Sequence, residues 1–273
     1  MKHDSSSSAK TSQIETAAPR TRVVLLGASN LSIAFPMVVE TARAMFDGPL
    51  EFIVAKGFGR SYGQESKFFG KKFPGILQSE LWDDIDRRAP LATVAVLADI
   101  GNDLAYGAPV ETILAWVEMA LDRLGARESR TVLNNLPLAS LQSVGSARYL
   151  LFRELFFPNC RLSRSEMLSR ADDLGAGLEK LAASRNTPIF SGEIDWYGRD
   201  PIHPRRRSAG AVWQRMLGAL AAHDEPPALV RPSLRAAWRL RRLKASAWSD
   251  FGFQRRAAQP SGRLADGATI ALY

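Results

Sequence analysis

Three residues of this chain have types and positions that suit nucleophilic catalysis. Ser29 follows the apolar run 21–26 and precedes a stretch with helical spacing. A serine hydroxyl needs a base that accepts its proton, and the base needs a group that orients it. His203 and Asp200 lie three residues apart, so one turn can present both. This pattern predicts acyl transfer with Ser29 as nucleophile, His203 as general base and Asp200 as the residue that orients the imidazole.

The negative oxygen that forms during acyl transfer requires hydrogen-bond donors aimed at it in advance. The candidates are the backbone N–H of Ser29, a glycine N–H from segment 56–63 and the carboxamide of Asn102. Gly57, Gly59 and Gly63 all lie in that segment, and the sequence does not choose among them. We take Gly59 as the prediction, which gives an oxyanion hole of Ser29, Gly59 and Asn102.

The elements that must position these residues alternate along the chain. Short apolar and β-branched runs, typical of strands buried on both faces, occur at 21–26, 50–55, 91–98, 130–133 and 187–190. Stretches with helical spacing lie between or after them, at 33–46, 110–124, 164–185 and 209–223. This alternation predicts a parallel sheet with helices on both faces. Ligands bind beyond the carboxyl ends of such strands, which is where all five candidate residues fall.

Four segments in this order resemble the motif blocks of a known family, the SGNH hydrolases, also called GDSL esterases and lipases. The blocks are Gly27-Ala28-Ser29-Asn30, the glycine-bearing segment 56–63, Gly101-Asn102-Asp103 and Asp200-Pro201-Ile202-His203. The resemblance covers about residues 21–220. Ala28 and Asn30 depart from the aspartate and leucine that usually flank the family's serine, which bears on substrate preference more than on the nucleophile.

The resemblance implies a flavodoxin-like, three-layer α/β/α fold and hydrolysis of carboxylic esters, acyl or acetyl, without a cofactor. It assigns Ser29, Asp200 and His203 to the catalytic triad, and Ser29, Gly59 and Asn102 to the oxyanion hole. No metal is expected either, because the chain has three histidines and one cysteine without metal-ligand spacing. The predicted partner is a small-molecule or acylated ester.

Two other nucleophiles deserve comparison with Ser29. Ser61 lies in a G-x-S-x-G segment, the pattern of the α/β-hydrolase nucleophile elbow. An elbow serine opens into a helix, whereas residues 64–72 are charged and interrupted by Gly70, so we do not expect Ser61 to be the nucleophile. Cys160 follows an apolar segment with no histidine near it, which favours a buried structural thiol.

Positive charge is concentrated at the carboxy-terminal end. Residues 226–273 hold eight arginines and one lysine against two aspartates, which accounts for +7 of the formal net charge of +8. We therefore predict three parts: a disordered tail (1–20), a hydrolase-like domain (21–225) and a basic extension (226–273). Within the extension we expect a helix over 233–249, docked through its tryptophans, and a loose segment over 254–273.

The basic helix supports an alternative function. A catalytically silent domain of this fold could act as a binding module, with the helix contacting anionic lipid, nucleic acid or an acidic partner.

Segment 146–158 is unusually apolar, and we expect core packing there, with the wall or lid of an acyl pocket as the alternative. No apolar run approaches the roughly 20 residues of a membrane span, and no secretory signal is recognisable, so the expected location is cytoplasmic. The oligomeric state stays open.

Overall fold

The computed structural model describes residues 18–221 and 230–273. Most of the predicted amino-terminal tail therefore lies outside the described residues, as do the predicted boundary at 225/226 and His223. None of the helices in the described part of the chain has the length and apolar character needed to cross a bilayer.

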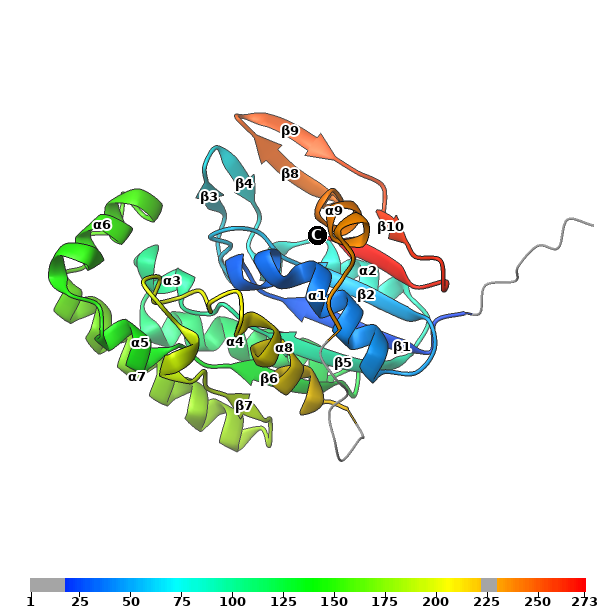
Figure 1. Ribbon diagram of the computed structural model, residues 1–273, viewed down its shortest axis with the longest axis horizontal. Helices are drawn as coiled ribbons and strands as arrows, with labels where there is room; N and C mark the ends of the chain where they lie inside the picture. Colours follow the sequence, from blue (N-terminus) through cyan, green and yellow to red (C-terminus); the bar gives the residue numbers. More distant parts are fainter. Residues whose placement is uncertain (1–17, 222–229) are drawn as a thin grey trace, which may run out of the picture.

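A seven-stranded, mostly parallel sheet forms the centre of the molecule (Figure 1). Its strands are β1 (Thr21–Leu26), β2 (Leu50–Ala55), β5 (Ala92–Leu97), β6 (Arg130–Asn134), β7 (Ile189–Phe190), β10 (Gly262–Arg263) and β11 (Thr269–Leu272). The order is β10-β11-β2-β1-β5-β6-β7, and only β10 runs antiparallel to its neighbour. The five predicted strands thus occur in the flavodoxin-like order 2-1-3-4-5, which confirms the expected fold class.

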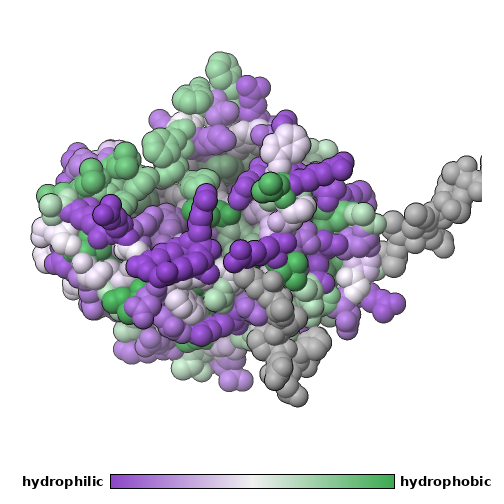
Figure 2. All heavy atoms as spheres, in the orientation of Figure 1, coloured by the Kyte–Doolittle hydropathy of each residue, from purple (hydrophilic) through white to green (hydrophobic). Residues whose placement is uncertain are grey.

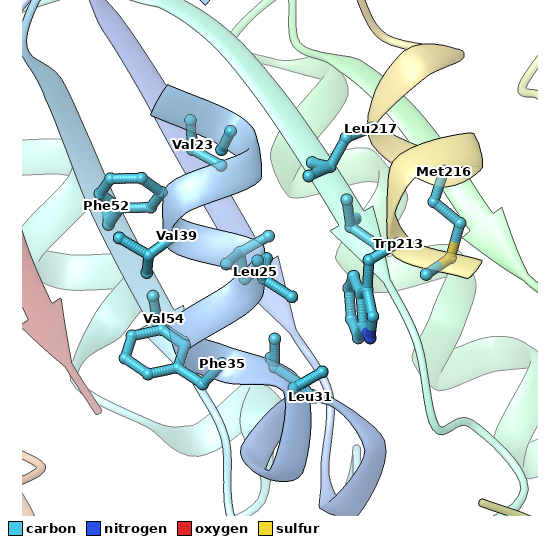
Figure 3. Packing of buried hydrophobic residues seen from close by; sticks show 14 of the residues in the cluster. Val23, Leu25, Leu31, Phe35, Val39, Phe52, Val54, Trp213, Met216 and Leu217 are labelled. Carbon is cyan, nitrogen blue, oxygen red and sulfur yellow. The ribbon is translucent and has the colours of Figure 1, made fainter. Parts of the chain in front are cut away.

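Helices cover both faces of this sheet. They are α1 (Ser29–Met45), α2 (Leu81–Arg87), α3 (Asn102–Ala105), α4 (Val110–Gly125), α5 (Leu138–Gln142), α6 (Ser146–Phe156), α7 (Arg164–Ser184), α8 (Ala209–Gly218) and α9 (Leu234–Arg241), with short 3₁₀ turns η1 (Ile76–Gln78) and η2 (Ile194–Trp196). One buried apolar cluster joins α1, α8 and α9 to the sheet, and a second joins α2, α3, α4 and α7 to the opposite face. Figure 3 shows the first cluster, where Phe35 of α1 lies next to Val54 of β2, and Leu31 of α1 lies toward Trp213 of α8.

The end of the chain is ordered, which makes the prediction of a loose segment over 254–273 wrong. Strand β11 pairs in parallel with β2, and its Ile270 is fully buried in the core. A second, antiparallel sheet has the order β3-β4-β8-β9. Its strands are β3 (Ser66–Phe68), β4 (Lys71–Phe73), β8 (Ala247–Asp250) and β9 (Phe253–Arg256). The extension therefore supplies strands to both sheets.

The predicted helix over 233–249 is correct only as far as Arg241. Residues 247–250 form β8 instead, because they pair with β4, and this tertiary pairing outweighs the local helical spacing. Helix α9 docks through Ala237 and Leu240, which are buried. Trp238 is 61% exposed, and the guanidinium of Arg242 lies 4.4 Å from its ring centroid, so docking through the tryptophans is also wrong.

Candidate active site

Ser29 is the first residue of α1, and a carboxylate from the neighbouring strand end holds its loop. The Asp99 side chain accepts hydrogen bonds from the backbone N–H groups of Ala28 (2.6 Å), Asn30 (3.3 Å) and Leu31 (3.3 Å). Asp99 has a φ of 61°, a left-handed conformation that few non-glycine residues adopt. A negative charge at this point is favourable because the first N–H groups of a helix lack intrahelical acceptors. Asp99 directly follows the predicted strand 91–98, but the sequence analysis assigned it no role.

Asn30 ties the serine loop to the histidine loop. Its Nδ2 donates to Asp99 Oδ1 at 2.7 Å and to the carbonyl oxygen of Ile202 at 3.0 Å. Ile202 directly precedes His203, so this side chain joins residues that lie 172 positions apart. Asn30 thus positions the loop that carries the imidazole.

Asp200 and His203 form the pair that their spacing predicts. The Asp200 Oδ2 lies 2.7 Å from His203 Nδ1, and Oδ1 accepts from the backbone N–H groups of Ile202 (3.0 Å) and His203 (3.1 Å). Burial raises the pKa of the Asp200 carboxyl, but the hydrogen bonds and charge of His203 and the N–H of Ile202 outweigh it and hold that pKa below its usual value. The carboxylate is therefore ionised at neutral pH and can orient the imidazole.

The structure brings all five predicted residues to one cavity of about 900 Å³. They are Ser29, Gly59, Asn102, Asp200 and His203. The Nε2 atom of His203 is buried and has no hydrogen-bond partner within the described residues. The imidazole and Ser29 therefore share a cavity without a hydrogen bond between them, and catalytic hydrogen bonds often tighten only when substrate binds.

The structure separates the three candidate glycines of the oxyanion hole. Gly57 and Gly59 line the cavity of Ser29, whereas Gly63 lines a different one and packs against the ring of Trp116. Gly59 has a φ of 63°, and a Cβ there would lie 2.8 Å from the hydroxyl oxygen of Tyr106. Within the described residues, the backbone N–H groups of Gly59 and Ser29 have no acceptor. These two donors are available to a bound ligand.

The Asn102 carboxamide lies at the same edge, where it begins α3. Its Nδ2 donates to the carbonyl oxygen of Arg60 at 3.3 Å, which fixes the amide relative to the loop of Gly59. One of its two N–H bonds then remains for a ligand. Asn102 lines the 900 Å³ cavity and also a second, mainly apolar cavity of about 180 Å³.

Ser61, the alternative nucleophile, lies in the interior and lines neither of these cavities. Its hydroxyl donates to the carboxylate of Asp103 and accepts from the N–H groups of Gly63 (3.2 Å) and Gln64 (3.0 Å). Asp103 also accepts from the N–H of Tyr62 at 3.0 Å. These contacts give Ser61 a structural role in holding its loop.

The buried Asp103 predicts a specific pH dependence of stability. Burial raises its pKa from the usual 3.8 to about 6, although the bonds from Ser61 and Tyr62 oppose that rise. Between those values the folded protein binds one more proton than the unfolded chain, so the free energy of unfolding falls as pH rises. The expected contribution is ~3 kcal/mol at 1.36 kcal/mol per pKa unit. The free energy of unfolding should be measured by urea titration near pH 4 and near pH 7 for the wild type and for Asp103→Asn. From the lower to the higher pH, the value for the wild type should fall by about this amount relative to the value for the variant. A difference between the two proteins that does not change with pH would contradict the prediction.

A second cavity, of about 180 Å³, shares Ser29 and Asn102 with the first. It is mainly apolar, and Tyr149, Phe152 and Phe156 of α6 line it, together with the buried Cys160. No residue of α6 is buried, so the expected core packing of 146–158 is wrong and the segment forms a cavity wall instead. Figure 2 shows hydrophobic side chains gathered over α6 and over the ends of the second sheet.

Of three comparisons with known proteins, only the comparison with solved structures found matches, and several of these are esterases. No protein-family model matches the chain, and no curated protein does. Among solved structures, the chain is similar to a psychrotrophic esterase from Pseudoalteromonas sp. (14% identity, 72% of this chain and 95% of the other, TM-score 0.45). It is also similar to a G-D-S-L family lipolytic protein from Veillonella parvula (11% identity, 72% of this chain and 97% of the other, TM-score 0.45). A third similar structure is an aryl esterase from M. smegmatis (12% identity, 73% of this chain and 99% of the other, TM-score 0.48).

Proposed function

We propose that this protein is a serine esterase that hydrolyses carboxylic esters through Ser29, His203 and Asp200. Ser29 Oγ attacks the acyl carbonyl while His203 Nε2 takes its proton. The tetrahedral intermediate collapses, the ester C–O bond breaks, and the same proton passes to the departing alcohol. Water then attacks the acyl-serine, gives one proton to His203, and releases the carboxylic acid while Ser29 recovers that proton.

The observation that carries this proposal is the environment of His203 Nε2. The other ring nitrogen, Nδ1, is paired with Asp200, whereas Nε2 is buried, has no partner among the described residues, and belongs to a side chain that lines the same cavity as Ser29. A buried polar atom without a partner costs free energy, so its occurrence calls for a role. Accepting a proton from a serine hydroxyl is a role that fits both its location and the orientation of the ring.

The N–H groups of Ser29 and Gly59 and the carboxamide of Asn102 support the same proposal. All three belong to residues of one cavity and have donor capacity that the described residues leave unused. Donors of this kind stabilise an oxyanion, and removing one costs roughly 3–4 kcal/mol in a well-studied protease.

Labelling with a fluorophosphonate probe, followed by peptide mapping, tests the proposal directly. The probe reacts with activated serines, so we expect one modified residue, Ser29, and no labelling of the Ser29→Ala variant. Modification of Ser61 in its place would overturn the assignment. A folded protein with no labelled serine would overturn the esterase itself.

That last result would favour a second candidate function, a catalytically silent binding module. Its basis is α9, where Leu234 is 92% exposed and Trp238 61% exposed, and which contains three arginines. Exposed apolar and cationic side chains on one short helix suit contact with an anionic surface, whether lipid, nucleic acid or an acidic partner.

A further inference from the structure

The large cavity around Ser29 holds an excess of positive charge. Four of its lining side chains are basic, while Asp200, which is paired with His203, is the one carboxylate among the described lining residues. The basic residues are Lys56, Lys71, Arg241 and Lys244. Within the described parts of the chain, none of the four forms an ion pair with a carboxylate. Their charges are therefore available to a ligand.

Lys56 is the cation best placed to act on the reacting ester. Leu26 and Ala55 are paired in register, so the loops that carry Ser29 and Lys56 leave adjacent parallel strands at the same level. The ammonium of Lys56 lies 4.9 Å from the ring centroid of Phe35, and Lys56, a partly buried residue, lines the cavity that Ser29 also lines.

A buried guanidinium beside Lys56 strengthens the positive field. Arg60 is fully buried, and its Nη1 donates to the Lys56 carbonyl oxygen at 3.4 Å. Its Nη2 has no partner within the described residues. Burial, followed by the charges of Arg60 and Lys71, lowers the pKa of Lys56 to about 8. A nearby anion would stabilise the charged ammonium, so these groups favour a negatively charged ligand.

The rest of the cavity wall is aromatic. Phe58, Phe68 and Phe73 line it with Trp248 of the second sheet. The Phe58 and Phe68 rings are stacked at 6.0 Å between centroids. A ligand that suits this cavity therefore combines a negative group with apolar contact surface, while the second cavity that Ser29 lines is mainly apolar.

Building on the proposed esterase function, we propose that the substrate is an ester whose alcohol part carries a phosphate or carboxylate group. Lys56 binds this anion, with Lys71, Arg241 and Lys244 at the rim of the cavity. The acyl chain occupies the apolar cavity that α6 lines. The two anions share the chemistry that a lysine recognises, and the substrates below distinguish them.

The test compares kcat/KM for octanoyl esters of four alcohols: glycerol, glycerol 3-phosphate, glycolate and choline. We expect at least one of the two anionic esters to be preferred about tenfold over the glycerol ester, since one partly desolvated charge pair contributes about this factor. Lys56→Met should remove most of the preference and Lys56→Arg should retain it. Because each ratio is measured on one protein preparation, partial unfolding cancels. Lys71→Met, at an exposed position, should reduce the preference by a smaller factor.

The matched control is Lys180→Met, which removes an exposed lysine of α7 that lines neither cavity and should leave every ratio unchanged. A preference for one anionic ester alone supports the proposal and identifies the group. Equal rates on all esters, preference for the glycerol or choline ester, or an anion preference that survives Lys56→Met would overturn it while leaving the esterase intact.

If no ester is hydrolysed, the esterase proposal fails and anion recognition is decided separately by calorimetry. Octyl phosphate and octanoate should bind at least tenfold more tightly than octanol, and Lys56→Met should abolish the difference. Equal binding of the charged and neutral probes would overturn the anion proposal too.

Discussion

Ser29→Ala is expected to lower kcat for a simple aryl acetate by about a thousandfold or more, with little change in stability. The Ser29 side chain begins α1 and caps no N–H group, because Asp99 accepts the bonds from that turn. Its loss therefore removes the nucleophile and little else. Removal of a triad member elsewhere has an effect of this size, and the activity that survives comes from the oxyanion hole and binding.

Ser61→Ala is the matched control, because it removes the same hydroxyl from the competing motif. The Ser61 hydroxyl takes part in three hydrogen bonds in the interior, so this variant should unfold at a lower urea concentration. Its kcat per folded molecule should stay within a few-fold of the wild type. Similar losses of kcat in both variants, or no loss in Ser29→Ala, would contradict the assignment of the nucleophile.

The sequence predicted the site well because the site depends on strand ends. Buried runs such as 21–26 and 50–55 are legible from their apolar and β-branched residues, and parallel strands bring their carboxyl ends to one edge. Ser29, Asn102 and His203 follow different strands, yet the topology places them around one cavity. The hydrophobic periodicity of the chain and the order of its motifs were therefore sufficient to predict that these residues meet at one edge of the sheet.

The carboxy-terminal strands were missed for a different reason. Strand β11 has four residues and pairs with β2, which lies more than 200 positions earlier in the chain. So short a run has no period of its own, and its identity as a strand depends on the partner edge that β2 presents. The same applies to β8, which lies within the helix expected over 233–249 but pairs with the edge that β4 offers.

The positioning residues were also beyond local patterns. Asp99 acts through a left-handed backbone conformation and three N–H groups from a different loop, and Asn30 acts through the Ile202 carbonyl. Both were visible as polar residues at strand ends, which is a usable signal. Their partners depend on distances that only the folded chain provides. Gly63 was separated from Gly59 in the same way, by its packing against Trp116.

Asp200→Asn is expected to lower kcat by three to four orders of magnitude while the fold is retained. The carboxylate uses one oxygen for the N–H groups of Ile202 and His203 and the other for His203 Nδ1. An asparagine can keep its carbonyl oxygen on the two N–H groups, but its NH₂ group then faces Nδ1 and donates to it. The imidazole is thereby held with its proton on Nε2, which is the wrong tautomer to accept a proton from Ser29.

Asp195→Asn serves as the control, because it removes an exposed carboxylate five residues away that lines neither cavity. Its kcat should match the wild type, which separates the tautomer effect from a general loss of negative charge near the site. Steady-state kinetics with an aryl acetate, together with fluorophosphonate labelling rates, would measure both variants. If Asp200→Asn kept its activity within tenfold, Asp200 would be a loop residue and the imidazole would be oriented by another group.

The low pKa of Asp200 leads to a related expectation: the wild type should lose no activity through protonation of this carboxyl until the pH falls below the usual carboxyl range near 4.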